Sequence, residues 1–67
     1  MEFTVKQARR HAELTQEAVA KELGVNVSTY ARLEKRPERF TMEQALRFCK
    51  VVSIPADEIK FFAAEST

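Results

Sequence analysis

The stretch TQEAVAKELGVNVSTYARLE, residues 15–34, contains the only glycine of the chain and decides its fold. Thr15 is a typical helix N-cap, and Gly24 supplies the left-handed conformation with which helices commonly end. Asn26, two residues after this glycine, is again a typical N-cap. Two short helices joined by so tight a connection indicate a helix-turn-helix unit over about residues 15–35, in which the second helix is presented outward.

The helical period divides this unit into an inward and an outward face. Four residues are expected to fill the angle between the two helices: Val19, Val25, Tyr30 and Leu33. Ala20 is expected to be the small residue where the two helices cross closely. Four others are expected on the outward face of the second helix: Val27, Ser28, Ala31 and Arg32. The second helix should therefore offer a surface of small, apolar and hydrogen-bonding side chains with one cation.

Capping boxes predict helices on both sides of the unit. Thr4 is followed three residues later by Gln7, and Thr41 in the same way by Gln44, so helices are expected over about residues 4–12 and 41–52. Pro37 should end the preceding helix at about residue 35. An apolar stripe is expected along the fourth helix: Ala45, Leu46, Phe48, Cys49 and Val52.

The last part of the chain predicts a fifth short helix. Pro55 suits a first helical position, and Asp57 and Glu58 suit the positive end of a helix dipole, which places this helix over about residues 55–62. No run shows the alternation of a strand, and no linker divides the chain. We therefore expect an all-α, compact five-helix fold formed by a single domain, residues 1–67.

Composition excludes several classes of protein. A chain of 67 residues with a net charge of +1 has no apolar run long enough to span a membrane and no secretory signal at its start, which favours the cytoplasm. Cys49 is the only cysteine, so an internal disulfide is excluded. His11 has no ligand partner at metal-binding spacing. With no nucleophile and base at usable spacing and no phosphate-binding loop, we expect neither an enzyme nor a cofactor or small-molecule substrate.

The run LTQEAVAKELGVNVSTYARLEK, residues 14–35, resembles the Cro and phage-repressor helix-turn-helix family, also called the Xre family. Arg9 in the first helix, FTMEQALRFCKVV in place of the fourth helix and SIPADEI in place of the fifth extend the resemblance over nearly the whole chain. The resemblance implies a lambda-repressor-like fold that binds double-stranded DNA. It also implies that the third helix lies in the major groove.

The resemblance assigns roles to individual positions. Base contacts are expected from the outward face of the third helix: Val27, Ser28, Ala31 and Arg32. Phosphate contacts are expected from the start of the second helix, the third helix and the loop after it: Gln16, Thr29, Lys35, Arg36 and Arg39. Arg9 and Glu34 resemble a structural ion pair, for which Arg10 is the alternative cation. Arg36 and Pro37 stand where the family usually has a glycine, so this helix must end in another way.

The expected partner is a double-stranded DNA operator, an inverted repeat bound by a homodimer, and the expected role is that of a transcriptional regulator acting as a repressor. The alternative is a protein-interaction module or antitoxin-type partner with the same fold. The near-neutral charge and the apolar Val27 and Ala31 on the outward face favour this alternative. The dependence of binding on salt separates the two, since only phosphate contacts release counterions.

Overall fold

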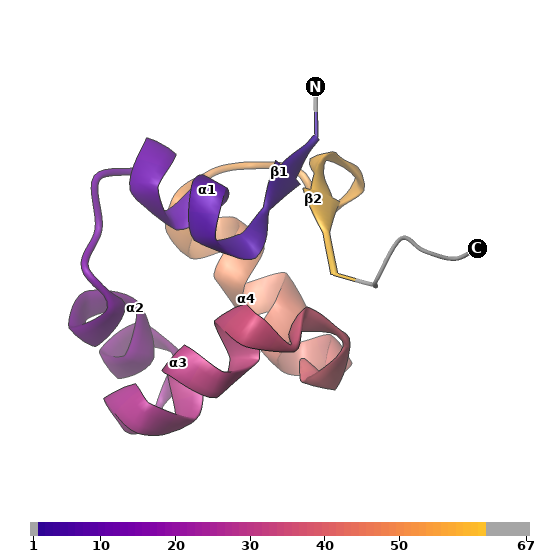
Figure 1. The fold of residues 1–67 in the computed structure, drawn as a ribbon. Coiled ribbons are helices and arrows are strands. Elements are labelled where there is room, and N and C mark those ends of the chain that lie inside the picture. The colour runs from indigo at the N-terminus through magenta and orange to yellow at the C-terminus, as the bar shows by residue number, and fades with distance from the viewer. Residues whose placement is uncertain (1, 62–67) are drawn as a thin grey trace.

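The computed structural model of the chain describes residues 2–61, and this part folds into short helices closed by a small pair of strands (Figure 1). The elements follow one another as β1 (Phe3–Thr4), α1 (Val5–His11), α2 (Gln16–Leu23), α3 (Val27–Lys35), the 3-10 turn η1 (Pro37–Arg39), α4 (Met42–Val52), the 3-10 turn η2 (Ala56–Glu58) and β2 (Ile59–Lys60). The helix-turn-helix unit predicted for residues 15–35 therefore corresponds to α2 and α3.

Each α-helix of the described chain begins at the polar cap that the sequence predicts. The side-chain oxygens of Thr4, Thr15, Asn26 and Thr41 accept the backbone N–H three residues further on, which satisfies a donor that the helix itself leaves unpaired. Both predicted capping boxes are present as well. These local bonds explain why helices of only 7 to 11 residues start at defined positions.

Gly24 ends α2 in the left-handed conformation, with φ of +74°. A Cβ built at this position would meet nothing within 4 Å, so the backbone conformation and not crowding favours glycine here. The N–H of the next residue, Val25, donates to the carbonyl of Ala20 at 3.0 Å. This turn directs the chain into Asn26 and α3.

The fifth helix predicted for about residues 55–62 is wrong, as is the expectation of a chain without strands. Only the three residues of η2 are helical, and Ile59 and Lys60 then pair in parallel with Phe3 and Thr4. A neighbouring strand from the other end of the chain takes up the backbone groups that a longer helix would have used. Phe62, the last residue of the predicted helix, lies outside the described residues.

The core lies where the other helices pack against α4, and it contains Val19, Tyr30 and Leu33, as predicted, together with Ala20. Val25, also predicted to fill the angle between α2 and α3, is half-buried and packs against this core. The rings of Tyr30 and Phe48 are fully buried, with centroids 6.4 Å apart, and join α3 to α4. Phe40 and Phe61 pack edge-on against Phe48 at 5.7 and 6.2 Å. The apolar stripe predicted for α4 is partly wrong, because Leu46 is 53% exposed.

Candidate nucleic-acid interface

The outward face of α3 is exposed to solvent over most of its length. Tyr30 and Leu33 anchor this helix in the core, and the helical period then directs other side chains to solvent. Ser28 and Arg32 are exposed, Val27 is 40% exposed, and Ala31 is half-buried. All four predicted base-contact residues thus lie on one face, in two adjacent rows of residues four apart: Val27 with Ala31, and Ser28 with Arg32.

Asn26 organises the start of α3 through one oxygen atom. Its Oδ1 accepts hydrogen bonds from the backbone N–H of Thr29 at 3.2 Å, from Thr29 Oγ1 at 2.8 Å and from Ser28 Oγ at 3.2 Å. The hydroxyl proton of Thr29 is therefore directed at the cap. Ser28 and Thr29 can still accept hydrogen bonds from outside through their free lone pairs.

A polar network holds α1, α2 and α3 together behind this face. Arg9 Nε donates to Glu34 Oε2 at 2.5 Å, and Gln16 Nε2 donates to Glu34 Oε1 at 3.0 Å. Arg9 Nη1 also donates to the carbonyl of Leu14 at 2.8 Å, in the connection between α1 and α2. The cation that pairs with Glu34 is thus Arg9, whereas Arg10, the alternative, is exposed.

The protonation of this network follows from burial and charge. Burial opposes ionisation of Glu34, but the hydrogen bonds from Arg9 and Gln16 outweigh it and lower the pKa of this carboxyl. Burial raises the pKa of Tyr30, and the neighbouring Glu34 carboxylate raises it further. The Tyr30 hydroxyl is buried near Glu34 but reaches no partner at hydrogen-bond geometry among the described residues. At neutral pH the network therefore contains an ionised Glu34 and a neutral Tyr30.

The start of α2 borders a shallow hollow lined by Arg9, Thr15, Gln16, Glu17 and Val27. Gln16, predicted as a phosphate contact, is half-buried and uses one amide proton for Glu34, which leaves a second proton and its carbonyl oxygen. The positive end of α2 favours an anion here, whereas the carboxylate of Glu17 in the first turn opposes one.

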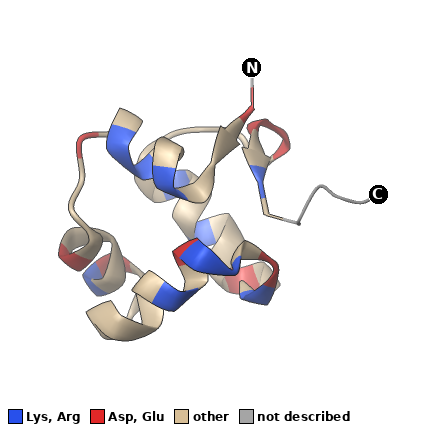
Figure 2. Cartoon of the chain, viewed as in Figure 1, with Lys and Arg blue, Asp and Glu red and all other residues tan. Residues whose placement is uncertain are grey.

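Cations gather at the other end of α3 and in the turn that follows. Figure 2 shows the first half of α3 without charged residues, and Lys and Arg along its second half. Lys35, Arg36 and Arg39 are all exposed, and Arg36 Nη1 lies 3.8 Å from Glu38 Oε2. Lys35 is the last residue of α3, and the C-cap Arg36 has φ of −129° and ψ of 72°, so the helix leads into η1 without the left-handed residue that a glycine would supply.

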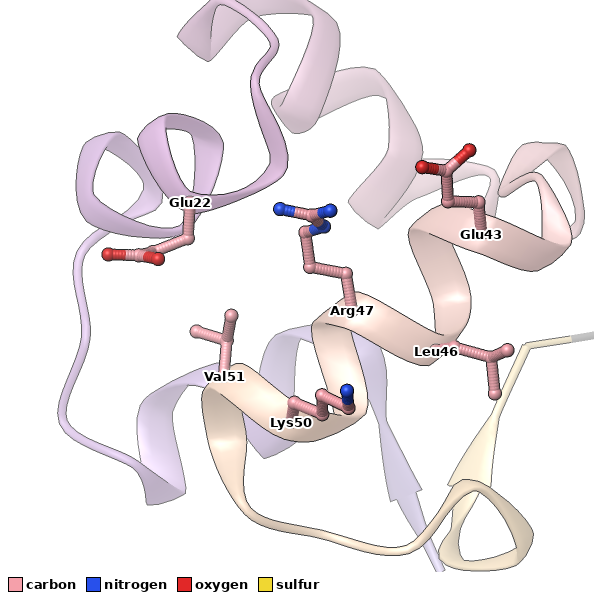
Figure 3. Close-up of a pocket in the computed structure, with 6 residues that line it drawn as sticks. All are labelled: Glu22, Glu43, Leu46, Arg47, Lys50 and Val51. Atoms are coloured by element: carbon pink, nitrogen blue, oxygen red, sulfur yellow. The ribbon is translucent and has the colours of Figure 1, made fainter.

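A second hollow, of about 560 Å³ between α2 and α4, is a weaker candidate for a nucleic-acid site. Figure 3 shows the Arg47 side chain lying between those of Glu22 and Glu43, with Lys50 on the same helix. Charges of opposite sign alternate over this surface, so it offers a phosphate backbone no continuous positive path.

Among residues 2–61, no group of three or more His, Cys, Asp or Glu side chains is placed to hold a metal ion. No helix in this part of the chain is long and apolar enough to cross a membrane.

Sequence reasoning missed two features of the interface. Gln16 and Glu34 lie 18 residues apart, and no local pattern indicates their hydrogen bond. Asn26 was predicted as a cap, but its second role, as acceptor for the Ser28 and Thr29 hydroxyls, depends on side-chain rotamers that spacing alone does not fix.

Comparison with known proteins places this geometry in a family. Searches of the curated proteins and of the solved structures gave no match for the chain. A family model described as helix-turn-helix matches residues 5–59, from the first residue of α1 to the first residue of β2. Its members are DNA-binding transcription regulators, and the match contains α2, the Gly24 turn and α3 in order. The chain therefore belongs to the Cro/C1-type helix-turn-helix family.

Proposed function

We propose that this protein binds duplex DNA sequence-specifically by placing α3 in the major groove, and that it regulates transcription, as a repressor, by occupying an operator. The observation that carries the proposal is the outward face of α3. Four side chains lie there in two rows and are small or long enough to reach base edges in the groove. The Arg9–Glu34–Gln16 network fixes α3 from the side that faces α1 and α2. Rigid placement of this kind is what base recognition by a helix requires.

Arg32 and Ser28 are the hydrogen-bonding residues of this face. Arg32 is exposed with its donors free of any ion pair among the described residues, so it can donate in a fork to O6 and N7 of a guanine. Ser28 directs its hydroxyl proton toward Asn26 and can accept from a base amino group. Val27 and Ala31 complete the base-contacting set with apolar surface.

The remaining predicted residues contact phosphates in this proposal. Lys35, Arg36 and Arg39 neutralise the backbone beyond the end of α3, while Gln16 and Thr29 bind closer to its start. Each neutralised phosphate releases counterions and steepens the salt dependence of binding. Glu38 lies near Arg36 but reduces the contribution of Arg36 to phosphate binding only slightly, since both side chains are exposed and the charged atoms are 3.8 Å apart.

A homodimer on an inverted repeat fits a domain with one recognition helix, because a single α3 contacts only a short half-site. The surface that supports a contact between two copies is an apolar groove of about 510 Å³ lined by α4, η1 and the end of the described chain. Met42 and Leu46 stand at its edge with exposed fractions of 75% and 53%, and Phe61 forms part of its wall. Burial of these side chains favours association of two copies.

The same groove supports a second candidate function, a protein-interaction module with another chain as partner. The two functions differ in their dependence on salt: affinity for DNA should fall steeply as salt rises, whereas an apolar protein contact should not weaken.

The experiment that tests the proposed function is a selection of bound sequences from a random duplex pool near physiological salt. Wild type should enrich an inverted repeat with half-sites about one helical turn apart. Arg32→Ala should relax base preference at one position of each half-site. Arg36→Ala should weaken binding to all sequences alike and lower the salt slope by about one. If the two variants behaved identically, the division into base-contacting and phosphate-contacting residues would be wrong.

The matched control for these variants is Lys60→Ala. Lys60 is an exposed cation on β2, which lies at the end of the molecule opposite α3 (Figure 1). Its replacement should change neither the selected sequence nor the salt slope. Failure of wild type to enrich any sequence, with no salt-sensitive retention of duplex, would favour the protein-interaction module.

A further inference from the structure

The first half of α3 presents apolar surface that the local structure of the helix does not require. Among residues 2–61 the exposed large hydrophobic side chains are Val27, Met42 and Leu46, and of these Val27 alone lies on α3. The helix is already capped by Asn26, and a β-branched residue adds nothing to helix propensity at this position. Ala31 follows four residues later, so its methyl group continues the apolar row along the helix.

The surroundings of this row also set its chemistry. Residues 27–31 carry no charge, and the polar row beside it begins with Ser28, whose hydroxyl proton is directed at Asn26. On its other side Val27 borders the hollow at the start of α2, with Thr15 and Gln16. The row formed by Val27 and Ala31 is thus a narrow apolar strip that polar groups flank on both sides.

We propose that this strip recognises the 5-methyl group of a pyrimidine in the major groove, and that 5-methylcytosine is therefore bound in the same way as thymine. The proposal deepens the proposed function and rests on it. Thymine and 5-methylcytosine carry the methyl group at the same ring position, whereas cytosine and uracil have hydrogen there. The bases differ at position 4, where thymine has an acceptor and cytosine a donor.

The strip contains no hydrogen-bonding side chain, so it responds to the methyl group and not to the group at position 4. Binding should then be sensitive to cytosine methylation at positions that face Val27. Removal of one methyl group from such a contact should weaken binding roughly threefold to fivefold, from the transfer free energy of one buried carbon. In a duplex with two half-sites the two losses multiply, to about ninefold to twenty-fivefold.

The test uses the duplex that wild type selects and measures Kd by fluorescence anisotropy at fixed salt. At each pyrimidine of the half-site, four duplexes carry thymine, uracil, cytosine or 5-methylcytosine. At the position that faces the strip, thymine should bind more tightly than uracil, and 5-methylcytosine more tightly than cytosine, by the factors above, since the bases of each pair differ only in the methyl group and share one partner base. The Val27→Thr variant keeps the shape of the side chain but replaces a methyl with a hydroxyl, and it should lose this dependence while still binding the duplex.

Val51→Thr is the matched control, since Val51 is a half-buried valine on α4 outside both the strip and the apolar groove, and the methyl dependence of this variant should equal that of wild type. Equal affinity for thymine and uracil duplexes at every position, with the selected sequence still preferred, would overturn the inference and leave the proposed function intact. A methyl dependence that Val27→Thr left unchanged would also overturn it. Absence of any sequence preference in wild type would overturn both.

Discussion

Replacing Arg9 with methionine would leave the carboxylate of Glu34, on α3, without its cation. The Glu34 side chain is 4% exposed and that of Arg9 12% exposed, so the pair is nearly removed from water. Breaking a buried ion pair by removing one partner costs about 3–5 kcal/mol. We expect the lower end, about 3 kcal/mol, because Gln16 continues to donate to Glu34. For a small domain this loss lowers Tm by roughly 12–24 °C.

The cost of Arg9→Met should depend on pH in a defined direction. In the wild type the pKa of Glu34 lies below its ordinary value of 4.5. Ionised Glu34 therefore stabilises the fold fully when the pH is above 4.5, and this stabilisation is lost as the pH falls through the lowered pKa. In the variant, burial remains as the largest influence on Glu34 and raises its pKa. The folded variant then takes up a proton more readily than the unfolded chain, and its penalty disappears as pH falls. The difference in unfolding free energy should therefore shrink between pH 7 and about pH 4.

The assay is urea unfolding followed by far-ultraviolet circular dichroism at pH 7 and pH 4. Arg10→Met is the matched control, because Arg10 is exposed on the same helix one residue away, and it should cost less than about 0.5 kcal/mol. The double variant Arg9→Met/Glu34→Leu should recover most of the loss, since no charge remains buried. A cost for Arg9→Met equal to that of Arg10→Met, or one identical at both pH values, would refute the reasoning.

Two further substitutions test the turn and the core. Gly24→Ala places a Cβ on a residue in the left-handed conformation, at φ of +74°, where it meets no neighbouring atom. The unfolding free energy should therefore fall by about 1–2 kcal/mol, which a lower Tm would show. Gly24→Asn should lower it less, since asparagine tolerates this conformation better. Tyr30→Phe removes a buried hydroxyl that reaches no partner, so urea unfolding should show no loss of stability, or a gain of up to about 1 kcal/mol. If Tyr30→Phe instead lowered the unfolding free energy, the hydroxyl would have to be hydrogen-bonded to Glu34 in solution.

The helix-turn-helix unit could be predicted from sequence because its signals are local. Thr15, Gly24 and Asn26 act on backbone groups within a few residues, and all three occupy the predicted positions. The period of Tyr30 and Leu33 then fixes which face of α3 is buried and which is outward. Local signals of this kind suffice for the start, the end and the orientation of a short helix.

The end of the chain could not be predicted in the same way. Pro55 and the acidic residues after it are typical of a helix start, but β2 pairs with β1 from the opposite end of the chain, and a two-residue strand is too short to show alternation. Ser53 ends α4 at φ of 59°, a conformation that the sequence does not announce because glycine is absent there. The exposure of Leu46 likewise depends on the position of η1 and β2 beside α4, which helical period alone does not determine.

The pairing of β1 with β2 has a consequence for the order in which the protein folds. Phe3 lies opposite Ile59, so this contact closes a loop that contains all four α-helices of the described chain. Closing so long a loop is entropically unfavourable until the helices between its ends have packed together. We therefore expect the strand pair to form last and to open first. Transient opening would then release the ends of the domain without disturbing α2 and α3, and DNA binding and local unfolding at the ends would be largely independent events.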